Sequence, residues 1–167
     1  EMGFKKSFFC KCDYAGIYNK AITEAENYGL ESVIVRRGLD EIFEFYDTEA
    51  VKRWNLKPGV SNILEKISDQ HIGIGLVTNV GLKAVTAILN RFGISRKFKC
   101  IVTRNSTSRL KPDATGINIA LNLLKACKDD CIFIGDSVTD IIAARSAGID
   151  IGIVLGGESS KEVLLSH

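Results

Sequence analysis

Polar residues at three places in the second half of the chain combine the side chains that phosphoryl chemistry requires. The three places are Thr78-Asn79, Lys111-Pro112-Asp113 and Gly135-Asp136-Ser137-Val138-Thr139-Asp140. The Thr78 hydroxyl and the Asn79 amide can donate hydrogen bonds to phosphoryl oxygens. Lys111 can neutralise charge on the phosphoryl group and on a nearby carboxylate. The set therefore indicates a site for a phosphorylated ligand.

Two carboxylates in the third group are suited to a metal ion. Asp136 and Asp140 offer hard oxygen ligands, and Mg²⁺ usually binds one or two carboxylates together with phosphate oxygens and water. Gly135 lets the backbone turn closely beside such an ion. These residues form the electrostatic part of a phosphoryl-transfer site with Mg²⁺ as cofactor, and they include no evident nucleophile.

Each of these residues also has an ordinary structural interpretation. Asp136 or Ser137 can cap a helix, Asp140 can be an acid in the first turn of that helix, and Lys111 can be a solvated charge. Thr78 is unremarkable by itself. For each residue taken alone, the structural interpretation is better than the functional one. All three groups nevertheless follow apolar runs in the same way, and jointly this order favours the functional interpretation.

The segment from residue 57 to 155 alternates between short apolar runs and helical stripes. Buried strands are predicted at 72–77, 100–103, 131–134 and 151–155. Helices are predicted at 84–92, 113–125 and 137–147, and another is opened by Pro58. Such alternation predicts an α/β fold, a Rossmann-like parallel sheet with helices on both faces. Groups that follow the strands then meet at one edge of the sheet.

The segment from residue 14 to 56 predicts a small helical unit beside this sheet. One helical stripe runs from Ile17 to Tyr28 and is closed by Gly29. One or two further helices are predicted over 39–46 and 48–54. Val33-Ile34-Val35 fits a strand and a buried helix equally well. The best boundary is Lys57-Pro58-Gly59, which divides the chain into residues 1–56 and 57–167.

The composition excludes several functions that depend on charge or on membrane insertion. The 22 basic and 20 acidic residues give a net charge of +2, which argues against nucleic acid or a membrane surface as partner. No apolar run approaches the ~20 residues of a membrane span. Five cysteines are an odd number and indicate reduced thiols in a cytoplasmic protein. The spacings Cys10-x-Cys12 and Cys127-x-x-x-Cys131 match no common zinc pattern.

The polar groups, read with their flanking residues, resemble three motifs of the haloacid dehalogenase-like (HAD-like) hydrolases. Residues 76–79, 110–113 and 133–148 are similar to the second, third and fourth motifs, most closely in the phosphoglycolate phosphatase-like branch. The resemblance implies that Thr78 binds the phosphoryl group with help from Asn79, and that Lys111 steadies an aspartyl-phosphate intermediate. It also implies that Asp136 holds Mg²⁺ with Asp140 assisting. It makes residues 1–56 a partial helical cap, residues 57–167 the HAD-like core, and the substrate a small phosphorylated metabolite.

The first motif of that family, Asp-x-Asp-Gly-Thr, has no counterpart in the sequence. Its two aspartates are the nucleophile and the general acid/base, whereas the nearest look-alike, Phe8-Phe9-Cys10-Lys11-Cys12, has cysteines at those positions. We expect the chain to be a fragment, incomplete at both ends, that begins inside the cap. The covalent step then has no evident agent.

Two classes of function are compatible with a sequence that lacks the first motif. The chain belongs either to a Mg²⁺-dependent phosphatase, or to a catalytically inactive homologue that binds a phosphorylated ligand or a protein partner. A response-regulator-like domain ranks lower, because its acids precede the threonine whereas here they follow Lys111. A dinucleotide site ranks lowest, because no Gly-x-Gly-x-x-Gly lies between a strand and a helix.

Overall fold

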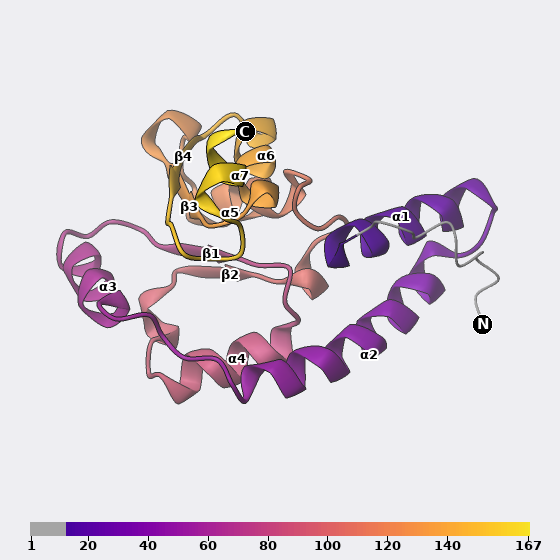
Figure 1. Cartoon of the computed structure of the whole chain (residues 1–167), viewed down its shortest axis with the longest axis horizontal. Helices are drawn as coiled ribbons and strands as arrows, with labels where there is room; N and C mark the ends of the chain where they lie inside the picture. The colour runs from indigo at the N-terminus through magenta and orange to yellow at the C-terminus, as the bar shows by residue number, and fades with distance from the viewer. Residues whose placement is uncertain (1–12) are drawn as a thin grey trace.

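The computed structural model describes residues 13–167, and its core contains two pairs of parallel strands (Figure 1). The strands are β1 (Gly75–Val77), β2 (Cys100–Val102), β3 (Ile132–Gly135) and β4 (Asp150–Ile153). β1 pairs with β2, and β3 pairs with β4 in a separate sheet. The α/β class and the parallel direction are as the sequence predicts. The strands are shorter than predicted, and within the described residues they do not join into one sheet.

The helices of the core alternate with these strands. They are α3 (Val60–Asp69), α4 (Leu82–Arg91), α5 (Thr115–Leu124), α6 (Val138–Ala147) and α7 (Lys161–Leu165). α3 begins after Gly59, which adopts a left-handed conformation with φ of 86°, so Pro58 precedes the helix and does not open it. α6 begins at a capping box and ends at Gly148, whose φ of 72° suits glycine.

α5 connects the two strand pairs through its apolar side chains. Ile117 and Leu121 of this helix belong to one buried cluster that also contacts Val77 of β1 and Phe133 of β3. The alanines of α6 complete the cluster, and their small side chains allow the helix to lie close to the strands. The relative placement of β1 and β3 therefore depends on α5 rather than on hydrogen bonds between the two strands.

An apolar cavity, called the slot below, separates β1 from β3. Its volume is about 170 Å³, and it is lined by Gly75 and Val77, by Ile132 and Phe133, and by Ile117 and Leu121. Ile132 and Ile134 are 63% and 58% exposed although they lie in a strand of the core. Within residues 13–167, β1 and β3 each have a hydrogen-bonded neighbour on one side only. Unpaired strand edges of this kind are able to accept a further strand.

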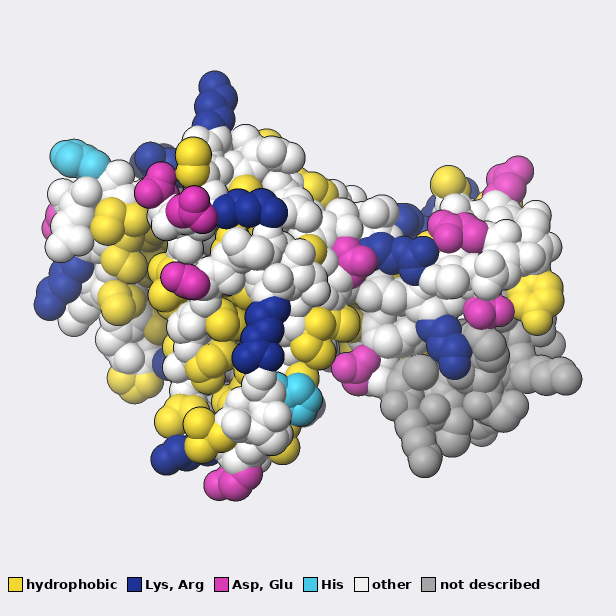
Figure 2. All heavy atoms as spheres, turned by 90° about the horizontal axis from the view of Figure 1, so that it is seen from above, with side chains coloured by type: hydrophobic (Ala, Val, Ile, Leu, Met, Phe, Trp, Pro, Cys, Tyr) yellow, Lys and Arg dark blue, Asp and Glu magenta, His cyan; other side chains and the backbone are white. Residues whose placement is uncertain are grey.

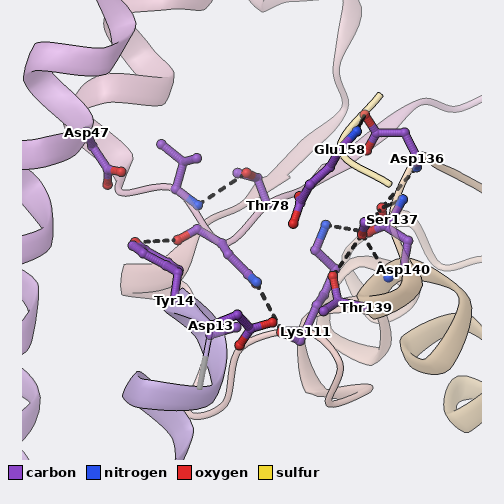
Figure 3. A pocket seen from close by; sticks show the side chains of 13 residues that line it. Asp13, Tyr14, Asp47, Thr78, Lys111, Asp136, Ser137, Thr139, Asp140 and Glu158 are labelled. Carbon is purple, nitrogen blue, oxygen red and sulfur yellow. Dashed lines mark hydrogen bonds and ion pairs between the residues drawn. The ribbon is translucent and has the colours of Figure 1, made fainter. Parts of the chain in front are cut away.

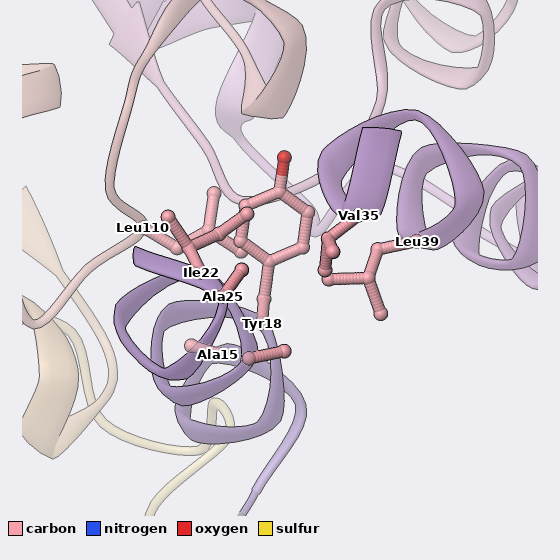
Figure 4. Close-up of a cluster of buried hydrophobic side chains, with 8 residues drawn as sticks. Ala15, Tyr18, Ile22, Ala25, Val35, Leu39 and Leu110 are labelled. Carbon is pink, nitrogen blue, oxygen red and sulfur yellow. The ribbon is translucent and has the colours of Figure 1, made fainter. Parts of the chain in front are cut away.

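A helical hairpin lies beside the core and is formed by α1 (Tyr14–Asn27) and α2 (Ser32–Val51). Its buried cluster contains Ala15, Tyr18, Ile22, Ala25, Val35, Leu39 and Leu110 (Figure 4). Val33-Ile34-Val35 is helical, and the one or two helices predicted after it are a single helix that ends at Val51. Leu110 belongs to the core segment and is fully buried among hairpin residues, so the two parts share this cluster.

The charged side chains are mixed by sign over the surface. On the face in Figure 2, the Lys and Arg side chains are interspersed with Asp and Glu. Among the helices of residues 13–167, none has both the length and the apolar character that crossing a bilayer requires.

Leu110→Ala is expected to lower the free energy of unfolding by about 2–5 kcal/mol, because it empties a position at the centre of the hairpin cluster. Urea denaturation followed by circular dichroism measures this change. Leu123→Ala is the matched control, because Leu123 is 60% exposed on α5 and its truncation should cost less than about 0.5 kcal/mol. Equal losses in the two variants would show that the hairpin does not depend on Leu110.

Candidate functional site

All five residues predicted to form the site line one cavity of about 390 Å³. Thr78 and Asn79 follow β1, Lys111 lies in the segment between β2 and α5, and Asp136 and Asp140 lie after β3. Figure 3 shows the side chains converging from these separate elements. The carboxyl ends of β1 and β3 therefore face a common space, although the two strands belong to separate sheets.

The central contact of the cavity is an ion pair between Lys111 and Asp140. Lys111 Nζ lies 2.7 Å from Asp140 Oδ1 and also donates to the Val77 carbonyl at 3.3 Å. Asp140 Oδ2 accepts hydrogen bonds from the amides of Asp136 and Ser137 and from the Ser137 hydroxyl. Both oxygens of Asp140 are thus engaged by protein groups, so this carboxylate holds Lys111 and the turn after β3 in place.

The electrostatics of Asp140 follow from these contacts. Burial raises the pKa of Asp140, but the Lys111 charge, its hydrogen bond and those from Ser137 and the Asp136 amide outweigh burial and leave the pKa below its ordinary value. Gly135 is required for this geometry, because a Cβ at that position would lie 2.4 Å from the Asp140 Cβ. The glycine predicted to allow a close turn allows the approach of this carboxylate.

Two asparagine side chains hold the backbone of the segment that carries Lys111. Asn79 donates to the Lys111 carbonyl at 3.1 Å and accepts from the Lys111 amide at 2.9 Å. Asn19 of α1 makes the same pair of bonds with Leu110, at 2.8 and 2.7 Å. The Asn79 amide therefore positions Lys111, and its predicted contact with a phosphoryl group stays a prediction.

Thr78 and Asp136 each keep one polar group directed to the cavity. The Thr78 hydroxyl oxygen accepts from the Val80 amide at 3.2 Å, and its hydrogen has no acceptor among residues 13–167. Asp136 Oδ2 accepts from the Glu158 amide at 3.2 Å, whereas Oδ1 accepts no bond from the described residues. A hydroxyl donor and a carboxylate oxygen are thus available to a ligand on opposite sides of Lys111.

The carboxylates of the cavity can hold Mg²⁺ only if ligands from outside this set complete its coordination shell. Among the residues that the structure describes, no group of three or more His, Cys, Asp or Glu could hold a metal ion. Asp136 and Glu158 line the cavity, and only Asp136 lies at the end of a strand. Mg²⁺ commonly binds through one or two carboxylates, with substrate phosphate and water completing the shell. The donor set fits that ion and that mode of binding.

Four polar residues of the lining lie outside the groups predicted from the strand ends. Asp13, Tyr14 and Asp47 come from the hairpin, and Glu158 comes from the loop before α7. The Tyr14 hydroxyl donates to the Asn79 carbonyl at 3.2 Å, and Asp47 accepts from the Gly81 amide at 2.9 Å. The hairpin therefore supports the loop after β1, and no local pattern in the sequence indicates these long-range contacts.

A buried arginine that sequence reasoning did not single out joins the hairpin to the core. Arg104 is fully buried, lies just after β2, and pairs with Asp40 at 2.9 Å and with Asp47 at 2.7 Å. Its guanidinium also contacts the Tyr14 hydroxyl and lies 3.7 Å from Glu44. Burial lowers the pKa of Arg104, but its bonds and charge interactions with Asp47, Tyr14 and Asp40 raise the pKa above its ordinary value.

The comparison with known families agrees with this geometry. A model described as haloacid dehalogenase-like hydrolase matches residues 11–154. The chain belongs to this family. The HAD-like motifs in the sequence and the strand ends in the structure therefore identify the same residues. The look-alike of the first motif at Cys10 and Cys12 lies outside the described residues.

The relatives of this HAD-like chain include phosphoglycolate phosphatases. It is 25% identical to a probable phosphoglycolate phosphatase of Pseudomonas putida, over 83% of this chain and 55% of the relative. It is 30% identical to the phosphoglycolate phosphatase of Yersinia pestis, over 76% of this chain and 56% of the relative. The chain thus spans about half the length of the curated relatives it matches.

Solved structures of HAD-like proteins show the same fold. A haloacid dehalogenase-like hydrolase from Bacteroides fragilis has a TM-score of 0.71 at 21% identity, with 92% of this chain and 85% of that chain covered. A predicted phosphoglycolate phosphatase from Haemophilus somnus has a TM-score of 0.60 at 26% identity, with 81% and 61% covered. The Rossmann-like α/β fold expected from the sequence is confirmed.

Asp140→Asn is expected to destabilise the HAD-like core by about 3–5 kcal/mol at pH 7, because it leaves a buried Lys111 without its partner. The folded pKa of Asp140 lies below the unfolded value, so its contribution is complete above about pH 5 and is lost as the pH falls through 3.8 and below. The difference in unfolding free energy between wild type and variant should therefore shrink with acid. Urea titrations at several pH values measure it.

The control for this pH series is Asp69→Asn. Asp69 is an exposed carboxylate on α3 that forms no ion pair among the described residues. Its loss should change stability by less than about 0.5 kcal/mol at every pH. A constant difference between wild type and Asp140→Asn across the acid range would contradict the role assigned to the ion pair.

Proposed function

We propose that this chain forms the phosphate-binding and Mg²⁺-binding side of a HAD-like phosphatase site for small phosphomonoesters. The observation that carries the proposal is the meeting of Thr78, Lys111 and Asp136 in one cavity. A hydroxyl donor, an ammonium and a free carboxylate oxygen match the needs of a phosphoryl group with a bound cation. The phosphoglycolate phosphatases among the relatives support the same class of substrate.

Each residue has a distinct task in this proposal. Thr78 donates its hydroxyl hydrogen to a phosphoryl oxygen, and Lys111 places its charge beside the group, with Asp140 fixing the ammonium. Asp136 would hold Mg²⁺ through Oδ1, and Asp140 assists by fixing the Asp136 amide. When bound, Mg²⁺ would neutralise phosphoryl charge and orient the group. Asn79 positions Lys111 in the cavity through hydrogen bonds to the Lys111 amide and carbonyl.

The nucleophile of the family has no counterpart among these residues. The sequence contains no Asp-x-Asp pair at any position. The slot lies between β1 and β3, which each have an unpaired edge among the described residues, and Thr78 and Asp136 follow these two strands. We place the strand that carries the family's first motif in this slot, where a residue following the strand would face the phosphoryl group.

The charges around the cavity favour a substrate whose organic part is neutral. Lys111 is the only cation among the described lining residues, whereas Asp13 and Glu158 also line the cavity, together with Asp47, which is paired with Arg104. A carboxylate on the substrate would face like charges at short range, which weakens binding. A hydroxylated phosphomonoester such as a sugar phosphate should therefore compete better than 2-phosphoglycolate.

The second candidate function is a binding protein without catalytic activity. The absence of Asp-x-Asp favours it, because the residues present can hold a phosphorylated ligand but cannot form an aspartyl intermediate. Phosphate binding is common to both functions, so only turnover separates them. Phosphate binding is therefore measured first, and turnover of a phosphomonoester second.

Inorganic phosphate should bind the 167-residue chain in the presence of Mg²⁺, as measured by isothermal titration calorimetry. Lys111→Met and Thr78→Val should each weaken binding by roughly tenfold or more, because a charged or hydroxyl donor to the phosphate is lost. Lys83→Met is the control, because Lys83 is exposed on α4 away from the cavity. Equal affinity in all four proteins would remove the site from consideration.

Turnover of p-nitrophenyl phosphate should require an added first motif. The chain alone should bind phosphate without hydrolysis, whereas the chain preceded by its upstream coding sequence, if that encodes Asp-x-Asp-Gly-Thr on an apolar strand, should show Mg²⁺-dependent turnover. The matched control replaces the first of those aspartates with Asn. An extended chain that binds phosphate but gives no turnover would favour the binding protein. Turnover by the chain alone, lost in Lys111→Met, would refute the need for a supplied nucleophile.

A further inference from the structure

The backbone at Lys111 is held from two parts of the chain, and one of these parts is the helical hairpin. Asn19 of α1 accepts from the Leu110 amide at 2.7 Å and donates to the Leu110 carbonyl at 2.8 Å. Asn79, which follows β1, makes the equivalent two bonds with Lys111. Two consecutive residues thus each have their backbone amide and carbonyl bound by one asparagine side chain.

Two arginines add to the hold of the hairpin on this segment. Arg36 of α2 donates to the Thr107 carbonyl at 2.8 Å and to the carbonyl of the next residue at 2.9 Å. Arg109 donates to the Asn19 carbonyl at 3.0 Å and pairs with Glu26 of α1 at 3.2 Å. Each of the four residues from Thr107 onward therefore makes at least one hydrogen bond to the hairpin.

The burial of Leu110 makes the bonds from Asn19 important for the backbone. Leu110 is fully buried, and its side chain lies in the hairpin cluster with Tyr18 and Ile22 (Figure 4). Its carbonyl also accepts from the Asp113 amide at 3.0 Å, whereas its amide has no partner other than Asn19 within residues 13–167. A buried amide without a partner is costly, so the loss of Asn19 should shift this backbone.

The position of the Lys111 ammonium depends on where this backbone lies. Nζ is 2.7 Å from Asp140 Oδ1 and 3.3 Å from the Val77 carbonyl oxygen. Because a lysine side chain is a flexible four-carbon stem, contacts at its two ends fix the ammonium. Asp140 and Val77 supply the contacts at the charged end, and the two asparagines supply those at the backbone end.

We propose that Asn19 is a positioning residue of the phosphate site, which acts through the backbone of Leu110 and Lys111. Asn19 does not line the cavity, so it has no contact with a ligand there. The hairpin then contributes to phosphate affinity by holding the cation that binds the phosphate. The effect on phosphate rests on the proposed function, whereas the effect on the Lys111 ammonium does not.

A double-mutant cycle on the 167-residue chain tests whether Asn19 acts through Lys111. Asn19→Leu should weaken the binding of inorganic phosphate with Mg²⁺ by roughly fivefold in the wild-type background, but by less than about twofold in the Lys111→Met background. Isothermal titration calorimetry measures all four proteins. Asn27→Leu is the matched control, because Asn27 is an exposed asparagine at the end of the same helix. A residue that only stabilised the fold would weaken binding by one factor in both backgrounds.

The NMR signal of the Lys111 ammonium tests the positioning without any ligand. The loss of one ¹⁵N–¹H ammonium signal in Lys111→Met assigns it. This signal should shift or broaden in Asn19→Leu, because the contacts of Nζ with Asp140 and Val77 change, and it should stay unchanged in Asn27→Leu. Asn19→Ala, which leaves space for water at the Leu110 amide, is the second variant. Circular dichroism establishes which variants are folded.

The two measurements separate this proposal from the proposed function. An unchanged ammonium signal in a folded Asn19 variant, wild-type phosphate affinity in that variant, or equal losses of affinity in the two backgrounds would overturn the role of Asn19. If the wild-type chain bound no phosphate while the ammonium signal still moved in the Asn19 variants, the proposed function would fail and the positioning of Lys111 by Asn19 would stand.

Discussion

The ion pair between Lys111 and Asp140 joins the two strand pairs of the core at the point where a phosphoryl group would lie. β1 and β3 share no hydrogen bonds within residues 13–167, so backbone pairing does not fix the distance between their carboxyl ends. Lys111 bridges this distance, because its backbone is held by Asn79 after β1 and its ammonium by Asp140 after β3. The placement of Thr78 relative to Asp136 depends on this bridge and on α5 beneath it.

A second buried charge places the hairpin over the same site. Arg104 is surrounded by carboxylates of α2, and the removal of such charges from water is costly unless the hydrogen bonds are nearly complete. The cluster therefore tolerates only one arrangement of α2 against the core. Because Tyr14 and Asp47 also hold the loop that carries Thr78, the orientation of the hairpin is transmitted to the phosphate-binding residue.

The sequence alone predicted those site residues whose position depends on the local pattern of strands and helices. Thr78 and Asp136 come just after apolar runs and Lys111 follows one across a polar loop, and the convergence of strand ends needs only the alternation of strands and helices. The roles of Asn79 and Asp140 as positioning groups depend on partners in other segments, which periodicity does not reveal. Arg104 and Tyr14 were not predicted for the same reason, since Arg104 pairs with Asp47 and Asp40, 57 and 64 residues away, and Tyr14 contacts Asn79, 65 residues away.

The division of the expected sheet has a related cause. Apolar runs predict that strands exist but not which edges pair, because pairing is a contact between distant segments. Of the strand predicted at 72–77, only Gly75–Val77 is a strand in the structure. The one or two helices predicted after residue 39 are both part of the single helix α2. Neither Thr48 nor its neighbours contain a glycine or proline that would end a helix there, so a break at that position had no physical basis.

The slot connects the stability of the core with the completeness of its site. Ile132 and Ile134 remain exposed in the described residues, so a strand that pairs with β1 and β3 would bury apolar surface worth roughly 25 cal/mol per Å². The same strand would end between Thr78 and Asp136, where the proposed chemistry lacks a nucleophile. A group that binds only the folded core stabilises it by mass action. Filling the slot would therefore complete the fold and the site in one event, and the free energy of folding would contribute to holding a reactive group against the phosphoryl oxygens.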